Sequence, residues 1–508
     1  MRRRYIATSA LALFAAACGS TIENTGSGPL GANNGQSLTV PSGAAGSNAP
    51  GTVGGSSGVG GGNATAGSGQ TATGAGSNGQ SAGQSGTSSG VGASVEPGDG
   101  PGVTATTINI ASAYDPDVAA ADSAIGAANA NPGDTKAEET AVINYINAHG
   151  GVAHRKINPI WYKASASNDA STTDQQACAY WTQDHKVFLN AAGDPLLDEC
   201  TAKSGGIALI SGGIVLETTA QNRKYPQDVN LTSFTIDHSM TVTINGLEKQ
   251  GYFSKGAKVG VVTWDDPYYH YGITQAAVPG FARLGLHNVP VQYVAVPQGV
   301  QDVSQTSAAA GNAVLKFRTM GIDHVIIFDG PAGITSSGVL WLEWSQQANS
   351  QQYYPKHGLN STSGFNAFGS EIPQKELEGA VGVGWLPSLE ETSSDWANTP
   401  LPPNGHLCFK IMKDAGQQQS GANAQAVQLG ICETLFFFKQ VLDPITGPIN
   451  RETAMAAINA MGGKFASMVT FGTTFNVNKH DGAYLVRNMQ FQDGCKCFRY
   501  TSRAYNPY

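Results

Sequence analysis

The segment Lys258-Val-Gly-Val-Val-Thr263 is a short apolar run between two predicted helices, near 240–250 and 275–284, and it establishes the fold class. Two strands of the same kind follow it, Val289-Pro-Val-Gln-Tyr-Val294 and His324-Val-Ile-Ile-Phe328, with another predicted helix between them. Short apolar strands that alternate with helices are typical of parallel sheets covered on both faces. This part of the chain therefore predicts a doubly wound α/β unit.

An earlier block of the chain repeats this alternation. Thr107-Ile-Asn-Ile-Ala111 predicts a strand, and Asp134 is placed to cap a helix that ends at His149-Gly150-Gly151. Three more strands are expected, at 157–162, 187–189 and 207–210. Two such blocks predict an α/β protein with two doubly wound parallel-sheet lobes.

The last third of the chain is less regular. Ala380-Val-Gly-Val-Gly-Trp385 predicts a strand, and helices are expected over 426–441 and 452–460. Residues 470–490 predict extended segments with a turn at His480-Asp-Gly482.

The N-terminal residues predict an export signal. Three arginines at positions 2–4 precede an apolar stretch over 6–17, which is too short to span a bilayer, and Cys18 and Gly19 follow. This arrangement resembles a bacterial lipoprotein signal, so residues 1–18 are predicted to be a signal peptide with Cys18 as the lipidated residue. An ordinary secretory signal or a short buried helix is the alternative, and the arginines also match twin-arginine export weakly.

A tether is predicted after the signal. Residues 19–102 are mostly Gly, Ser, Ala, Asn and Thr, which offer too little apolar side chain to offset the entropy of ordering. A flexible coil of this length has an end-to-end distance of roughly 50 Å. It would hold a folded domain, from residue 103 onward, clear of a membrane surface.

Composition excludes some partners. The formal net charge is -8, only 13 % of residues are charged, and no Lys/Arg cluster follows the signal, so no nucleic acid is expected. No later apolar run approaches membrane-spanning length.

Six cysteines remain once Cys18 is set aside. An even number in an exported protein predicts three disulfides. Proximity in the sequence favours Cys178–Cys200 and Cys408–Cys432, and it leaves open whether Cys495 and Cys497 close a very small ring. The ten histidines are scattered without metal-ligand spacing, so no metal and no cofactor are expected.

Four motifs together resemble the extracellular solute-binding receptors of ABC transporters, of the branched-chain amino-acid and amide type. They are Gly102-Val-Thr-Ala-Thr-Thr-Ile-Asn-Ile-Ala111, Ile146-Asn-Ala-His-Gly-Gly-Val-Ala-His-Arg-Lys-Ile157, Lys258-Val-Gly-Val-Val-Thr-Trp-Asp-Asp266 with Tyr271-Gly272, and Leu377-Glu-Gly-Ala-Val381. Their order and spacing across about 102–490 carry the resemblance.

The resemblance implies a type I periplasmic-binding fold, in which three crossing segments join two lobes and a ligand closes the cleft between them. Lobe 1 would be 103–232 plus 384–478, and lobe 2 would be 233–383 plus 479–508. The chain would capture an amino acid, amide or other small solute outside the cytoplasm and deliver it to ABC permease subunits. The resemblance also places Cys178 at the start of a first-lobe disulfide.

Ligands of doubly wound sheets bind beyond the carboxyl ends of the strands. In lobe 1 this rule selects Tyr114, Asp115, Ala192, Gly193, Gly212, Gly213 and Ile214. In lobe 2 it selects Asp265, Tyr268, Tyr269 and Asp329, and Trp385 stands at a crossing segment.

Each of these residues also has a structural interpretation. Gly212 and Gly213 would let backbone N–H groups approach an anion, or they would form a tight turn. The tyrosines would present surface to a ligand or pack at the lobe edge. Asp265 and Asp329 would pair with a ligand cation, or cap helices, which is the favoured role for Asp266. Trp385 would be a cleft wall or a core residue.

The lobe 1 turns depart from the amino-acid receptors that the chain resembles. Those receptors grip the ligand's amino and carboxylate groups with hydroxyl-bearing turns. Here the turns are Ala191-Ala-Gly-Asp-Pro195 and Ser211-Gly-Gly-Ile-Val-Leu216, which largely lack Ser and Thr. A larger or less polar ligand, or one held by backbone donors, is therefore expected in place of an α-amino acid.

Two other functions were weighed. An extracellular sensor or adhesion module on the same fold is the alternative, because a long tether suits a surface role and fold does not determine function. An enzyme is not expected, because no nucleophile–base spacing, phosphate loop or metal motif occurs in a credible context.

Overall fold

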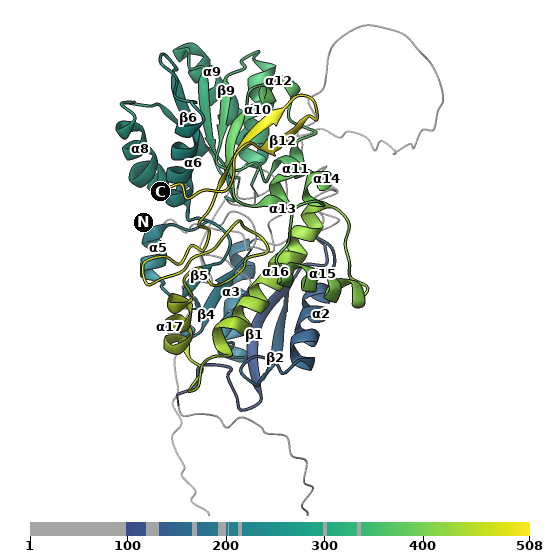
Figure 1. Ribbon diagram of the computed structural model, residues 1–508. Helices are drawn as coiled ribbons and strands as arrows, with labels where there is room; N and C mark the ends of the chain where they lie inside the picture. Colours follow the sequence, from purple (N-terminus) through teal and green to yellow (C-terminus); the bar gives the residue numbers. More distant parts are fainter. Residues whose placement is uncertain are drawn as a thin grey trace, which may run out of the picture. The chain divides into compact units, whose positions relative to one another are not determined.

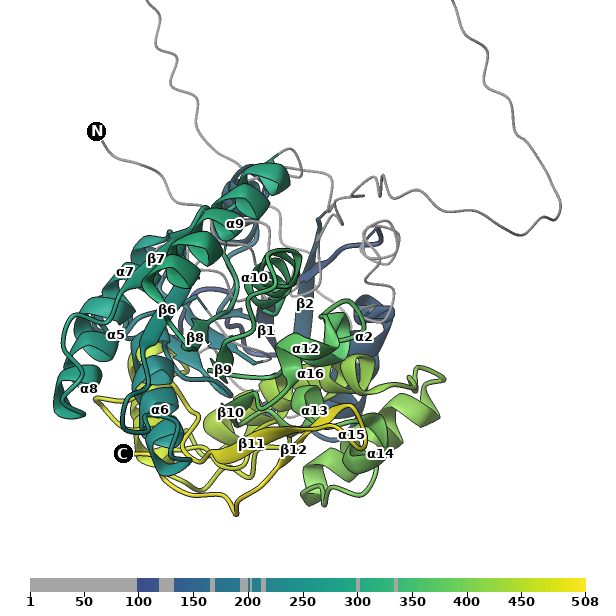
Figure 2. The ribbon, with the colours of Figure 1, turned by 90° about the horizontal axis from the view of Figure 1, so that it is seen from above.

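The computed structural model describes residues 98–117, 132–164, 170–191, 200–201, 203–211, 216–297, 302–332 and 337–508. The predicted signal peptide and lipidation site lie outside the described residues, as does the tether except for its last five positions. Figures 1 and 2 show that the described chain forms two sheets with helices around them.

The first sheet is entirely parallel and has the strand order β2-β1-β3-β4-β5. Its longest pair is β1 with β2, in which Ile108 lies opposite Ile157. The strands are β1 (Thr107–Tyr114), β2 (Lys156–Lys163), β3 (Leu189–Asn190), β4 (Ile207–Ile210) and β5 (Asp228–Asn230). All four strands predicted in this block are present, although β3 begins two residues later than expected.

Helices cover both faces of this sheet. Ile108 and Ile110 of β1 pack in the main core with α2, whereas Ala111 and Ala113 pack with Trp181. Successive side chains of a strand point to opposite faces, so these two clusters lie on opposite sides. The helices that come early in the chain are α2 (Thr135–Ala148), α3 (Ala170–Ala179) with its π-helical continuation η3 (Tyr180–Asp184), and α5 (Thr219–Lys224).

Later helices return to the first sheet. α15 (Pro403–Asp414) and α16 (Ala422–Leu442) pack beside α2, as Figure 1 shows, and α17 (Arg451–Met461) follows them. The ends of α2 agree with the sequence. The Asp134 carboxylate accepts from Ala137 N at 3.0 Å, and His149 is the C-cap. Gly151 follows with a φ of 71°, and a Cβ there would lie 2.1 Å from the Arg155 carbonyl oxygen, so this turn requires glycine.

The second sheet is mixed and has the order β12-β11-β10-β9-β8-β6-β7. Five strands are parallel, and β11 and β12 add an antiparallel edge. The parallel strands are β6 (Val259–Trp264), β7 (Val291–Val294), β8 (His324–Phe328), β9 (Lys356–Leu359) and β10 (Val381–Gly384). The antiparallel strands are β11 (Arg487–Gln492) and β12 (Cys497–Tyr500). All six residues of β6 are buried, as expected for a strand covered on both faces.

Two groups of helices flank this sheet on opposite sides in Figure 2. One group is α6 (Ile236–Lys249) with the continuous run α7 (Pro267–Gly272), η4 (Ile273–Ala277) and α8 (Val278–Arg283). The other group is α9 (Val303–Met320) and α10 (Val339–Ser350). Four short helices follow, namely α11 (Phe365–Phe368), α12 (Gln374–Leu377), α13 (Pro387–Glu390) and α14 (Ser393–Trp396).

The turn predicted at His480-Asp-Gly482 is wrong. Asn476 and Lys479 pair as an antiparallel bridge, so the chain turns at Val477 and Asn478. Residues 470–486 contribute only isolated bridges, and the regular hairpin comes later, as β11 and β12. The sequence also failed to predict β9, α10 and α15.

Three disulfide bonds are present in the described part of the chain. Cys408–Cys432 joins α15 to α16, and Cys178–Cys200 joins the end of α3 to the segment before β4. The third bond, Cys495–Cys497, lies within the β11–β12 hairpin. The two pairings that sequence proximity favours are therefore formed.

The proposed lobe boundaries remain a prediction, although the first sheet ends at Asn230 and the second begins at Val259. In the part of the chain that the structure describes, no helix combines the length and apolar character needed to cross a membrane.

Candidate functional site

The carboxyl ends of β8 and β9 are held together by one side chain. Asn360, directly after β9, accepts from Asp329 N at 3.1 Å and donates to Asp329 O at 2.7 Å. This two-point bond fixes the spacing of the two strand ends. It places the residues that follow each strand at one edge of the sheet, where ligands of such sheets bind.

Asp329 organises the turn after β8. Its carboxylate accepts from the backbone N–H groups of Gly330 at 2.7 Å, Gly338 at 2.8 Å and Trp341 at 3.2 Å. It therefore caps the N-terminus of α10. Burial raises the pKa of the Asp329 carboxyl to about 7, although these hydrogen bonds oppose the rise. The sequence predicted either pairing with a ligand cation or helix capping for Asp329. In the structure its carboxylate is engaged in helix capping.

A small cavity lies at this edge. Its internal space is about 10 Å³, which is about the volume that one water molecule needs. The lining is rich in hydroxyl groups and comes from the ends of β8 and β9 and the start of α10. The lining residues are Asp329, Ser337, Gly338, Trp341, Leu359, Asn360, Ser361, Ser363 and Gly364.

Two of the lining residues carry a buried polar atom that has no partner among the described residues, Ser337 Oγ and Trp341 Nε1. A buried hydroxyl or indole N–H that makes no hydrogen bond destabilises a protein by roughly 1–3 kcal/mol. Such donors at a cavity indicate a place for a polar group from outside the chain, either a water molecule or part of a ligand.

One wall of the cavity is fixed by Glu390 at the end of α13. Its carboxylate accepts from Ser361 Oγ at 2.9 Å, from Leu386 N at 3.0 Å and from the hydroxyl of Tyr500 in β12. Burial raises the pKa of Glu390 to about 7. The turn after β9, the helix after β10 and the edge strand β12 are therefore joined through one carboxyl group.

The turn Asn360-Ser361-Thr362-Ser363 was not predicted from the sequence, because the strand before it, β9, was not predicted either. β9 reads Lys-His-Gly-Leu and has no aliphatic run. Its His357 is fully buried, with burial lowering the pKa to about 4, and the ring accepts from Trp344 Nε1 at 3.1 Å. The available signal was the hydroxyl-rich Ser-Thr-Ser run itself, which lies between the predicted strands at 324–328 and 380–385.

The other lobe 2 candidates gather at the end of β6. Asp265 is exposed and lies 2.8 Å from His270 Nε2, and Asp266 caps α7 by accepting from Tyr268 N at 2.9 Å. Burial raises the pKa of Asp266 to about 6. Tyr269 is 1 % exposed and donates to the Pro331 carbonyl at 3.2 Å. Half-buried Tyr268 packs against the core, so Asp265 has the most accessible side chain of this group.

Trp385 has no exposed surface and packs edge-on against Phe234, with ring centroids 5.1 Å apart. This burial favours its interpretation as a core residue. The structure brings Trp385 close to the cavity wall only through its backbone N–H, which donates to Glu390 at 3.3 Å.

The lobe 1 candidates are described only in part. Ala192, Gly193, Gly212, Gly213 and Ile214 lie outside the described residues. Tyr114 ends β1 and is half-buried, and its ring packs edge-on against Trp161 at 6.1 Å. Lys136 Nζ lies 4.1 Å from the Tyr114 ring centroid, which is cation–π distance. Asp115 follows and accepts from Asp117 N at 2.8 Å.

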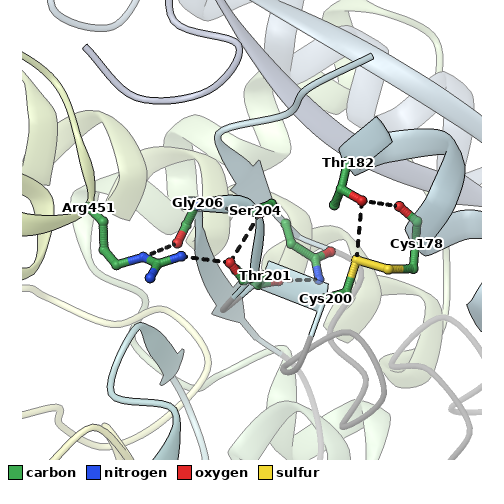
Figure 3. The surroundings of a disulfide bond; sticks show 8 residues. Cys178, Thr182, Cys200, Thr201, Ser204, Gly206 and Arg451 are labelled. Carbon is green, nitrogen blue, oxygen red and sulfur yellow. Dashed lines mark hydrogen bonds between the residues drawn. A yellow bond between two sulfur atoms is a disulfide. The ribbon is translucent and has the colours of Figure 1, made fainter. Parts of the chain in front are cut away.

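A second small cavity lies beside the Cys178–Cys200 disulfide, whose surroundings are drawn in Figure 3. Asn190 at the end of β3 lines it together with Thr201, whose carbonyl accepts from Arg451 at 2.7 Å. Arg451 also donates to the Gly206 carbonyl at 2.9 Å. These bonds tie the start of α17 to the segment before β4, which indicates a structural role for this cavity.

The residues that line the β8–β9 cavity carry three hydroxyls, an indole, a side-chain amide and one carboxyl, that of Asp329, which is engaged with backbone donors. Across the described ranges, no group of three or more His, Cys, Asp or Glu side chains is arranged to hold a metal ion.

No protein-family model matches the chain, and no curated protein matches it. Solved structures do match. A possible leucine/isoleucine/valine-binding protein from Rhodopirellula baltica SH 1 has a TM-score of 0.53 at 12 % identity, over 78 % of this chain and 96 % of that one. A branched-chain amino-acid ABC transporter protein from Thermus thermophilus with bound valine has a TM-score of 0.52 at 16 % identity, over 79 % and 96 %.

A third match is a solute-binding protein of an ABC transporter from R. palustris in complex with 4-hydroxybenzoate. Its TM-score is 0.53 at 13 % identity, over 79 % of this chain and 97 % of that one. The predicted fold is confirmed: the chain has the two-lobed type I periplasmic-binding fold of ABC-transporter substrate-binding proteins.

Proposed function

We propose that this protein is an extracytoplasmic solute-binding receptor that captures a small molecule between its two lobes and delivers it to an ABC permease. The observation that carries the proposal is the hydroxyl-lined cavity at the carboxyl ends of β8 and β9, with two buried donors that have no partner among the described residues. In this fold that edge is where ligands bind. Ligand binding would close the lobes, and the closed form would be recognised by the permease.

The ligand would be a small organic molecule with a polar end. Ser337 and Trp341 would meet that end in lobe 2, and Tyr114, Asp115 and the turns at 191–195 and 211–216 would form the lobe 1 half. The structural neighbours bind ligands as different as valine and 4-hydroxybenzoate, so the fold leaves the ligand open. The scarcity of hydroxyls in the lobe 1 turns still favours a ligand other than an α-amino acid.

Cys18 would anchor the chain to a membrane, and residues 19–102 would act as the tether. A Cys18→Ser variant should leave the membrane fraction and appear in the soluble fraction, and mass spectrometry should find no lipid on its N-terminal peptide. Unchanged membrane attachment of this variant would contradict the anchoring proposal.

Native mass spectrometry of the protein purified from its own host tests the receptor proposal. A stoichiometric small molecule, released unchanged on denaturation, is the expected result. It would also argue against an enzyme, which would return a product. If no ligand co-purifies and no metabolite in a panel shifts the melting temperature, the sensor or adhesion alternative is favoured.

Two serines of the same region form a matched pair for testing the cavity. Ser337 lines the cavity and Ser345 does not, and the Oγ atom of each is buried without a partner among the described residues. We expect Ser337→Ala to weaken binding of the identified ligand about five- to tenfold, the effect of one lost hydrogen bond. Ser345→Ala should leave affinity unchanged. Equal losses in both variants would mean that the effect arises from helix stability.

A further inference from the structure

The disulfide Cys495–Cys497 differs from the other two in the loop that it closes. Cys178–Cys200 and Cys408–Cys432 span 22 and 24 positions, whereas Cys495 and Cys497 are only two positions apart. A disulfide stabilises a fold mainly by restricting the unfolded chain, and the restriction shrinks with the loop. This bond therefore adds the least to folding stability.

The hairpin that carries this disulfide is held by other contacts. Residues 489–492 of β11 pair in register with 497–500 of β12. Phe498, next to Cys497, is buried and packs against Trp341 and Phe365, with ring centroids 5.7 and 5.2 Å apart. The strands would stay paired without the sulfur–sulfur bond. A structural explanation for the bond is therefore weak.

The two sulfur-bearing residues are unequally accessible. The loop Asp493-Gly494-Cys495-Lys496 is exposed, whereas Cys497 is 3 % exposed. An incoming thiolate can therefore reach Cys495 but not Cys497. Lys496 between them carries a positive charge, which favours thiolates. Its φ of 50° lies in the left-handed region, as the tight turn between the two paired strands requires.

We propose that Cys495–Cys497 is a reversible thiol–disulfide exchange site for an external low-molecular-weight thiol. The thiolate attacks Cys495 Sγ, a mixed disulfide forms there, and the electron pair of the broken bond leaves on Cys497 Sγ, which takes a proton from water. A second thiolate attacks the external sulfur of the mixed disulfide and releases Cys495 as a thiol. In sum, two external thiols are oxidised to one disulfide and the protein disulfide is reduced to two thiols. This inference does not depend on the ligand-binding proposal.

The first test places the full chain in buffers of graded reduced-to-oxidised glutathione ratio, followed by quenching with an alkylating reagent and peptide mass spectrometry. Cys495 and Cys497 should be half-reduced at a ratio at least about tenfold lower than the other four cysteines, because exposed disulfides are the more readily reduced class. Circular dichroism should not change, and oxidised glutathione should restore the bond. Reduction of all three disulfides together, or only upon unfolding, would overturn the proposal.

A matched pair of variants tests which sulfur is attacked. In Cys497→Ser the exposed Cys495 has no resolving partner, so oxidised glutathione should leave a stable adduct on it. In Cys495→Ser the remaining thiol is the buried Cys497, which should stay unmodified in the folded protein. Equal labelling of the two variants, or an unlabelled Cys495 in a folded Cys497→Ser variant, would contradict the assigned direction of attack.

Discussion

Ser361 donates its hydroxyl hydrogen to Glu390 Oε1 across 2.9 Å, and this bond joins the turn after β9 to the helix that follows β10. The same carboxyl group accepts from Tyr500 of the edge strand. The hydroxyl at the cavity wall is thus positioned by a buried acid, and the protonation state of that acid has consequences for stability.

Glu390→Gln should change the pH dependence of stability. Burial raises the pKa of Glu390 from 4.5 to about 7, so the folded state holds this proton more tightly than the unfolded state does. Its contribution is most favourable below pH 4.5 and is lost as pH rises through about 7, by up to about 3 kcal/mol. Glutamine does not titrate, so the variant does not lose stability in this way as the pH rises. Urea unfolding at pH 5 and pH 8 should show that the substitution is more favourable at pH 8.

The comparison must be made as variant minus wild type, because His357 titrates with the opposite sign. Burial lowers the pKa of His357 from 6.5 to about 4, so its contribution is present above pH 6.5 and is lost as pH falls toward 4. Subtracting the wild-type free energy of unfolding from that of the variant removes the contribution of His357, which is the same in both proteins. An equal difference between the two proteins at both pH values would show that Glu390 is ionised in the folded state throughout.

Asp329→Ala should destabilise the start of α10. The substitution removes the acceptor of three backbone N–H groups and leaves them buried. We expect a loss of about 1–3 kcal/mol in the free energy of unfolding, together with faster amide exchange at Gly338 and Trp341. Asp329→Asn is the control, because it keeps one oxygen acceptor and should lose less. Equal losses in both variants would assign the effect to charge and not to capping.

Removing the Cys408–Cys432 bond should cost much more stability than removing Cys495–Cys497. The first bond closes a loop spanning 24 positions between two helices, and loss of such a constraint corresponds to about 3 kcal/mol. Ala at both positions of the first pair, and Ser at both positions of the second, should give clearly different midpoints of urea unfolding. Similar midpoints would mean that the small ring constrains the hairpin in the folded protein.

Trp385→Phe tests whether this residue has a structural or a binding role. The indole is fully buried, and its Nε1 has no partner among the described residues. Phenylalanine removes the unpaired donor but leaves part of the indole's volume unfilled, so the free energy of unfolding should fall by about 1–3 kcal/mol. Ligand affinity should not change. A large loss of affinity with stability retained would restore Trp385 as a cleft residue.

The regular alternation of apolar strands and helices was predictable, because burial on both faces imposes continuous apolar runs such as Val259–Trp264. β9 was not predictable, because its interior positions are filled by His357 and Gly358. The neighbours of His357 form hydrogen bonds with its ring, and the neighbours of Gly358 leave no room for a side chain. A Cβ on Gly358 would lie 2.8 Å from Leu247. Such tertiary compensation leaves no periodic signal in a single sequence.

For the candidate site, the rule of strand carboxyl ends led to Asp329 but not to its partners. Asp329 ends up capping α10, and the cavity belongs to the serines after the unpredicted strand. Tyr269 and Trp385 were predicted to contact a ligand but are buried in the core. A single sequence does not tell whether a large side chain near a strand end is buried or faces a ligand, because the answer depends on where the neighbouring element lies.

The antiparallel edge of the second sheet means that β10 gains one of its two neighbouring strands from a segment far along the chain. β10 pairs on one side with β9 and on the other with β11, which lies more than a hundred residues further along the chain. Until residues 487–500 arrive, β10 is a bare apolar edge, open to pairing with another chain. A chain that lacks Arg487 and the residues after it is therefore expected to aggregate more readily than the full sequence, and it should be cleared by proteolysis.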